Sequence, residues 1–138
     1  MSGAACELVA RCFAARTIAH YAHLTTGSFA QHVALGDFYD AVATAADEFF
    51  ECWQSIHGKQ QPDAFPPMRL AAGDIVSQLM ALHTWIADNR EEACENYEDT
   101  DDADDAKKEG AGCTELANLI DNILAVVDRT IYKLRYLK

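Results

Sequence analysis

The sequence has little of what sheets, tight turns and disulfide scaffolds require. Only seven of the 138 residues are glycine and three are proline, whereas half are hydrophobic. Few helix breakers and many alanines favour helices over strands. The five cysteines are odd in number and form no C-x-x-C pair. We therefore expect reduced thiols in a cytoplasm, that of the host if the protein is viral, and no cysteine-bound zinc.

Two further absences narrow the class of protein. No run of 18 or more apolar residues occurs, and the N-terminal residues lack the basic start and apolar core of a signal peptide. We therefore expect no membrane partner and no secretion. There is also no basic patch or tail, and DNA binding through neutralised phosphates needs one. The expected partners exclude nucleic acid.

Acidic residues are unevenly placed along the chain. The net charge is −11, and residues 91–109 alone hold ten acids and two lysines. We interpret this run as a solvated acidic connection, at about 98–112, within a single domain of residues 1–138. The alternative is that the protein is an acidic inhibitor and that this run occupies a basic site on a host protein.

Apolar residues recur at helical spacing in four segments. They predict helices over about 4–25, 29–57, 67–97 and 114–137, which is an all-α, four-helix bundle. The second segment is the clearest, with a stripe at Leu35, Tyr39, Val42, Ala46, Phe49, Trp53 and Ile56. His32 extends that stripe upstream. Ser28 and Gln31 form a predicted capping box, and Pro66 and Pro67 suit the first turn of the third helix.

Three of the five histidines lie at the break between the first two predicted helices. His20 and His23 share a face of the first helix, and His32 lies in the second turn of the next. On a helical wheel, His32 shares a flank with Asp47 and Glu51. Imidazole and carboxylate together suit a divalent transition metal, so these residues are candidate ligands.

Distance decides how such ligands could meet. His32 and Asp47 are 15 residues apart, about 22 Å along a helix, so they cannot share an ion within one chain. Two second helices crossing antiparallel about a twofold axis near residue 40 would bring His32 of one copy to Asp47 and Glu51 of the other. Gly36 and Ala43 are small residues near that crossing. A di-iron site inside the bundle is not expected, because no Glu-x-x-His pair occurs.

The stretch from His20 to Glu51 resembles the Dps family, the mini-ferritins. The ferroxidase motif of that family is two histidines, two aspartates and a glutamate at fixed spacing. His20, His32, Asp47 and Glu51 match four of those positions in type and spacing, and Gly36 stands at the fifth. "HLTTGSFAQHVALGDFYD" and "DRTIYKLRYL" are also similar to segments of small ferritin-like proteins of tailed phages.

The resemblance implies a ferritin-like bundle that oxidises and stores iron at sites between subunits. His20 and His32 would be nitrogen ligands from one chain, and Asp47 and Glu51 oxygen ligands from its neighbour. His23 would be a spare ligand or a group that supports the ligands, and Zn or Mn could replace Fe. The assembly would be at least a twofold homodimer and, in the mini-ferritin pattern, a dodecameric shell. Enzyme activity would be that of a ferroxidase.

A second hypothesis keeps the ferritin-like fold without efficient metal chemistry, as a structural or interaction protein. In it, His32 is a hydrogen-bonded core histidine, and Asp47 and Glu51 belong to a solvated flank. His83 and His57 are interpreted as structural, and His57 suits the negative end of a helix.

Overall fold

The computed structural model describes residues 3–95 and 113–138, and these residues form helices and connecting segments only. The elements are α1 (Ala4–Thr25), α2 (Phe29–His57), the 3-10 turn η1 (Pro62–Ala64), α3 (Ile75–Asp88), α4 (Arg90–Cys94) and α5 (Cys113–Tyr136). The predicted all-α class is confirmed. None of the helices in these two ranges is long and apolar enough to cross a membrane.

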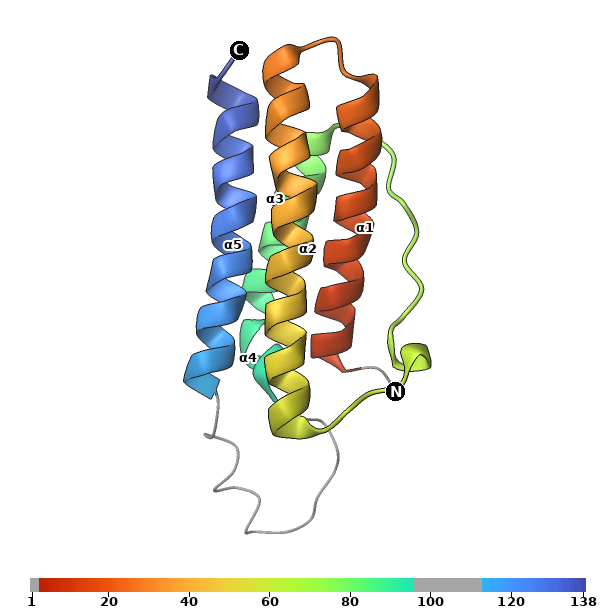
Figure 1. The fold of residues 1–138 in the computed structure, drawn as a ribbon, viewed down its shortest axis with the longest axis vertical. Coiled ribbons are helices and arrows are strands. Elements are labelled where there is room, and N and C mark those ends of the chain that lie inside the picture. The colour runs from red at the N-terminus through yellow and green to blue at the C-terminus, as the bar shows by residue number, and fades with distance from the viewer. Residues whose placement is uncertain (1–2, 96–112) are drawn as a thin grey trace.

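The long helices lie side by side (Figure 1). α1 and α2 form an antiparallel hairpin, and the segment after α2 then runs back along the length of the molecule. α3 therefore starts at the same end as α2, and α5 returns antiparallel to both. α2 packs mainly against α1 and α5, whereas α3 packs against α5 and α1. One long connection thus separates two antiparallel pairs.

Three of the four predicted helices have the expected bounds to within one residue, because their apolar stripes face the core. On α2 the stripe residues Leu35, Val42, Ala46, Phe49 and Trp53 are buried. α1 contributes buried Leu8, Cys12 and Ala19, and α5 contributes buried Leu116, Ile120, Ile123 and Val127. Removal of these side chains from water is the main force that holds the helices together.

The third helix corrects the prediction of 67–97. Residues 67–74 are not helical, and α3 begins only at Ile75. Gly73 has a φ of 121°, which ends any helical path from the prolines, and the Asp74 carboxylate then accepts the Ser77 backbone N–H at 3.0 Å as an N-cap. A break at Asn89 separates α3 from α4, and the predicted end at residue 97 lies outside the described residues.

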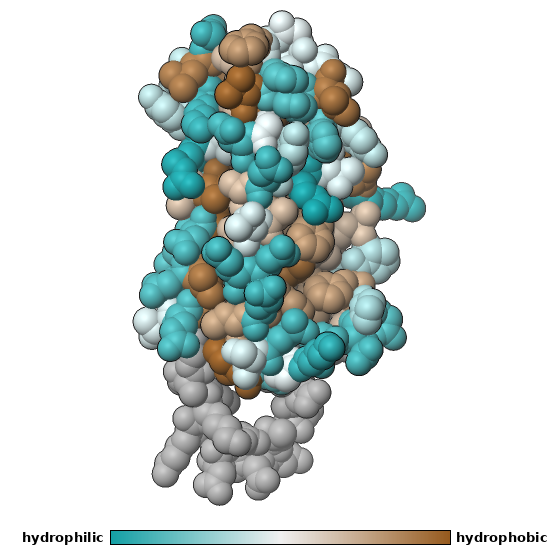
Figure 2. Space-filling view, viewed as in Figure 1, coloured by the Kyte–Doolittle hydropathy of each residue, from teal (hydrophilic) through white to brown (hydrophobic). Residues whose placement is uncertain are grey.

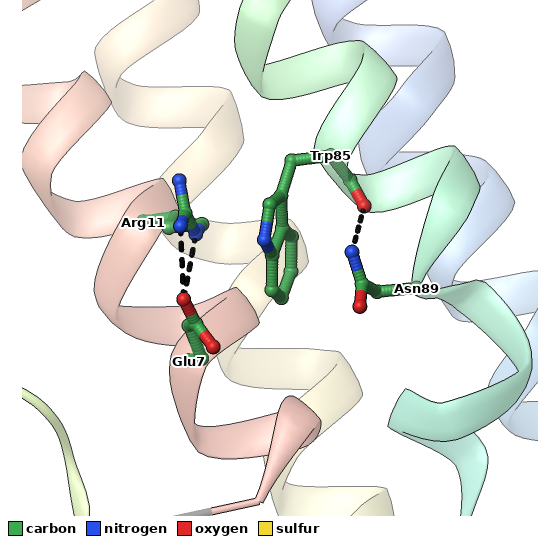
Figure 3. Close-up of polar contacts among 4 residues, drawn as sticks. All are labelled: Glu7, Arg11, Trp85 and Asn89. Carbon is green, nitrogen blue, oxygen red and sulfur yellow. Dashed lines mark hydrogen bonds and ion pairs between the residues drawn. The ribbon is translucent and has the colours of Figure 1, made fainter.

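Polar and aromatic contacts fix α3 and α4 against their neighbours. Figure 3 shows the Arg11 guanidinium of α1 between Glu7, at 2.9 Å, and the Trp85 ring of α3, whose centroid is 4.5 Å away. Asn89 donates its side-chain N–H to the Trp85 carbonyl at 2.8 Å where α3 ends. Arg90 forms a two-pronged ion pair with Asp121 of α5, at 2.8 Å for both contacts. These contacts set the pairing of α3 and α4 with α1 and α5.

Candidate functional site: the histidine hairpin and the outer face of α2

The turn between α1 and α2 brings the histidines together. Ser28 caps α2 by accepting the Gln31 N–H at 3.3 Å, as predicted. The Gln31 side chain does not complete a capping box, because its amide oxygen accepts the Thr26 hydroxyl at 2.8 Å instead. Ser28 donates its own N–H to Thr26 at 3.1 Å. This tight turn places the last turns of α1 beside the first turns of α2.

His23 and His32 contact each other across that hairpin, and we call this contact the clasp. Their rings stack with centroids 3.7 Å apart and planes 19° from parallel. The Nδ1 atom of His23 lies 2.6 Å from the His32 carbonyl oxygen, and Nδ1 of His32 lies 2.9 Å from the His23 carbonyl oxygen. A carbonyl only accepts, so both Nδ1 atoms must carry the proton. The His23 carbonyl belongs to the last turn of α1, where helix carbonyls lack intrahelical partners.

Gly36 makes room for this clasp. A Cβ atom built on Gly36 would lie 3.1 Å from Cε1 and 3.3 Å from Nδ1 of His23. Those separations are shorter than ordinary van der Waals contact, so any larger residue would push the ring away. The sequence suggested Gly36 as a gap in a ligand set or a small residue at a helix crossing. In the structure, the His23 imidazole lies against Gly36, in the space that a side chain there would occupy.

His20 extends the cluster along α1. Its ring stacks on Tyr39 of α2 at 4.2 Å and lies edge-on to His23 at 6.0 Å. His23 therefore lies between His20 and His32. Tyr39 was predicted only as a stripe residue, and its contact with His20 could be suspected only from its place on the neighbouring helix. Within residues 3–95 and 113–138, no three His, Cys, Asp or Glu side chains of this chain are arranged to hold a metal ion.

His32 lies outside the core, which corrects its place on the packing stripe. It is exposed, whereas Ala34 and Leu35 are buried. His32 lies in the second turn of α2, near the end of the hairpin, and its ring is held against His23 instead of the core. With Nδ1 protonated, a neutral His32 ring has its free lone pair on Nε2.

Asp47 and Glu51 lie farther along the same unbroken helix. Both are exposed, one turn apart, and neither carboxylate forms a hydrogen bond or ion pair with another described residue. The separation of His32 from Asp47 along α2 is therefore about 22 Å, as one continuous helix requires. The structure thus brings His20, His23 and His32 together at one end and leaves Asp47 and Glu51 apart from them on α2.

A shallow groove of about 520 Å³ runs between α2 and α5. Asp37, Asp40 and Glu48 line it from α2, and Arg129 lines it from α5. None of the predicted ligands is among its lining residues. The adjacent Asp37 carboxylate lies 3.7 Å from the Lys133 ammonium.

The remaining candidate residues have structural contacts. His83 contacts Asp128 of α5 at 3.1 Å, and Nε2 of His57 donates to the Cys94 carbonyl at 2.8 Å. Complete burial raises the pKa of the Cys12 thiol to about 12, so it is inert at neutral pH. Residues 96–109 of the acidic run lie outside the described residues, and Glu91, Glu92 and Glu95 are exposed.

The described residues define an all-α fold in which His23 of α1 stacks on His32 of α2, and Asp47 and Glu51 are exposed farther along α2. The chain belongs to a family of unknown function (DUF5856), whose model matches residues 23–107. That match includes His23, Gly36, His32, Asp47 and Glu51, and it leaves out His20. No curated protein matches the chain. No solved structure matches it.

Proposed function

We propose that this protein is a ferritin-like, Dps-like iron protein whose sites form between two copies. His32 and His20 of one copy supply nitrogen ligands, and Asp47 and Glu51 of the other supply oxygen ligands. The single observation that carries the proposal is the outer face of α2. It holds an exposed imidazole near one end and two exposed carboxylates toward the other, with residue 40 near their midpoint.

Charge along α2 supports an antiparallel pairing of the two copies. The first turn of α2 contains no acid, and a helix N-terminus carries partial positive charge. Asp47, Glu48 and Glu51 lie in the second half of the helix. Asp37 and Asp40 lie nearer the expected crossing, so antiparallel pairing sets the positive end of each α2 against Asp47, Glu48 and Glu51 of the other.

The exposed apolar residues at the start of α2 support the proposal that a second copy covers this face of the helix. Phe29 is 81% exposed and Val33 is 45% exposed, one turn apart on the side of α2 away from the core. Figure 2 shows hydrophobic side chains among polar ones at the end of the molecule where α1 meets α2. A second copy laid along α2 would remove Phe29 and Val33 from water.

The path of the chain supports the ferritin-like assignment. Two antiparallel helix pairs joined by one long connection are the arrangement that distinguishes ferritin-like bundles from simple up-and-down bundles. Here the connection spans residues 58–74 (Figure 1). Phe65 anchors it by packing its ring against Phe50 of α2, with centroids 5.0 Å apart.

The donor set suits Fe(II) as a substrate. Two imidazoles and two carboxylates leave coordination positions open to an oxidant, so that bound Fe(II) could pass an electron to peroxide or dioxygen. Zn(II) or Mn(II) would be held by the same atoms. The proposal includes no nucleic acid partner, because residues 1–138 carry a net charge of −11.

The proposal is tested by anaerobic titration with Co(II), a coloured substitute for Fe(II), and by admission of air to Fe(II)-loaded protein. His32→Ala and Asp47→Asn should each lower the affinity for Co(II) about tenfold or more. Asp88→Asn, at an exposed carboxylate on α3, is the matched control and should bind like the wild type. Ferric product should form faster than in buffer only when both ligand types are present.

A mixing experiment separates sites between chains from sites within one chain. His32→Ala and the double variant Asp47→Asn/Glu51→Gln should each bind little Co(II) alone. Unfolded together and refolded at equal amounts, they should recover about a quarter of the wild-type sites, because half of randomly assorted dimers are mixed and each holds one intact site. No recovery would overturn the proposed arrangement.

A second candidate function is an interaction module without metal chemistry. It is favoured by the reciprocal hydrogen bonds of His23 and His32, which give both histidines a purpose without an ion. In that case Co(II) would neither bind at His32 nor change the mass in solution. The exposed surface of Phe29 and Val33 would still bind a partner.

A further inference from the structure

We propose that His23 is a positioning residue for His32: it holds the His32 ring with Nδ1 turned inward and Nε2 turned outward as the ligand atom. The consequence for metal binding rests on the proposed function. The clasp itself rests only on the geometry of the α1–α2 hairpin.

The hydrogen bonds determine the protonated nitrogen of each ring. His32 donates from Nδ1 to the His23 carbonyl oxygen at 2.9 Å, and His23 donates from Nδ1 to the His32 carbonyl oxygen at 2.6 Å. Both acceptors are carbonyls, so neither bond forms if Nδ1 is the unprotonated nitrogen. When the ring is neutral, the lone pair of His32 must therefore be on Nε2, the nitrogen that can bind a metal or accept a hydrogen bond, and the residue as a whole is exposed.

Stacking prevents the His32 ring from turning. The His23 ring covers one face of His32 at a centroid distance of 3.7 Å, with the planes 19° apart. Gly36 allows this stack, because a Cβ there would come within 3.1 Å of the His23 ring. A ring whose lone pairs lie in its own plane cannot share an ion with a ring stacked on its face. His23 is therefore a support for His32 and not a third ligand to the same ion.

Metal-binding histidines in proteins commonly donate their other ring N–H to a carbonyl or carboxylate, which fixes the tautomer. His32 has this arrangement before any ion arrives. His83 provides a contrast within the same chain, because its Nε2 faces the Asp128 carboxylate at 3.2 Å and must carry the proton there. The two histidines should therefore be of opposite tautomer.

Nitrogen-15 NMR of the metal-free protein, at a pH where the histidines are neutral, tests the clasp directly. His23 and His32 should show protonated Nδ1 atoms, whereas His83 should show a protonated Nε2 and serves as the internal reference. Protonated Nε2 on His32 in the wild type would overturn the inference, whether or not the protein binds metal.

Substitutions distinguish the positioning role of His23 from a general effect on the fold. His23→Ala removes the stack and should move His32 toward the mixed tautomers of free histidine, with Co(II) affinity reduced about tenfold or more. Both variants keep the backbone carbonyl of residue 23, but His23→Phe also keeps a ring stacked on His32, so it should restore the Nδ1–H form. Gly36→Ala should act like His23→Ala although both histidines are retained, because the new Cβ displaces the His23 ring.

The outcomes distinguish the two proposals. If the tautomers are as expected but Co(II) does not bind, the clasp stands and the iron function fails. If Co(II) binds at His32 and His23→Ala changes neither tautomer nor affinity, the positioning role fails and the iron function stands. Circular dichroism of each variant confirms that the helices are intact before either conclusion is drawn.

Discussion

Gly36 lies in the interior of α2, near its start, where glycine is normally unfavourable. In the interior of a helix it costs about 1 kcal/mol relative to alanine, because the unfolded chain loses more freedom on ordering. The His23 ring against Gly36 gives a physical reason for accepting that cost. The residue therefore links a local preference of the chain to the arrangement of two imidazoles.

The effect of Gly36→Ala on the free energy of unfolding should change sign when His23 is also replaced. In the wild type, Gly36→Ala should destabilise the fold by about 1 kcal/mol, because the new Cβ displaces His23. In the background of His23→Ala, the same change should stabilise it by about 1 kcal/mol through helix propensity. Urea unfolding of the four proteins measures both values, and equal effects in the two backgrounds would contradict the contact.

For single residues, the sequence supplies the candidate ligands but not their geometry. The types and spacing of His20, His32, Asp47 and Glu51 are visible in the sequence. The stack of His23 on His32 was not predictable, because it depends on how closely two helices approach, to within a few tenths of an ångström. His32 was placed on the packing stripe for the same reason, since periodicity alone does not show where a neighbouring helix ends.

Among the helices, α3 differs most from expectation. Pro66 and Pro67 suit a helix start, and apolar residues at 68 and 72 continue the stripe upstream. Gly73 and Asp74 override that pattern with a left-handed residue and an N-cap. The other three long helices were predicted well, because their stripes are long and their termini coincide with breaks in the pattern.

Loss of the Asp74 cap should weaken α3 locally. Its carboxylate accepts the Ser77 N–H at 3.0 Å and the Ser77 hydroxyl at 3.1 Å. Asp74→Ala should cost about 1 kcal/mol, whereas Asp74→Asn should retain nearly all of the stability because asparagine caps equally well. Hydrogen exchange at the Ser77 and Gln78 amides reports the change, and equal exchange in the two variants would argue against a capping role.

Two features concern the molecule as a whole: the long connection between α2 and α3, and the strongly negative net charge. The segment of residues 58–74 returns the chain to the end at which α2 began, which sets α3 parallel to α2 (Figure 1). The sequence predicted four helices and an acidic connection, but helix spacing carries no information about the direction in which a long connection runs. A net charge of −11 also opposes self-association, so a cation between two copies would favour the dimer.

In the proposed dimer, two copies pair through α2, so that the imidazole of one faces the carboxylates of the other. Diffraction from crystals soaked in Co(II), recorded at the cobalt absorption edge, tests it most directly. We expect anomalous density between His32 of one copy and Asp47 and Glu51 of the next, across a twofold axis near residue 40. Copies that meet through another surface, or cobalt bound away from α2, would contradict it.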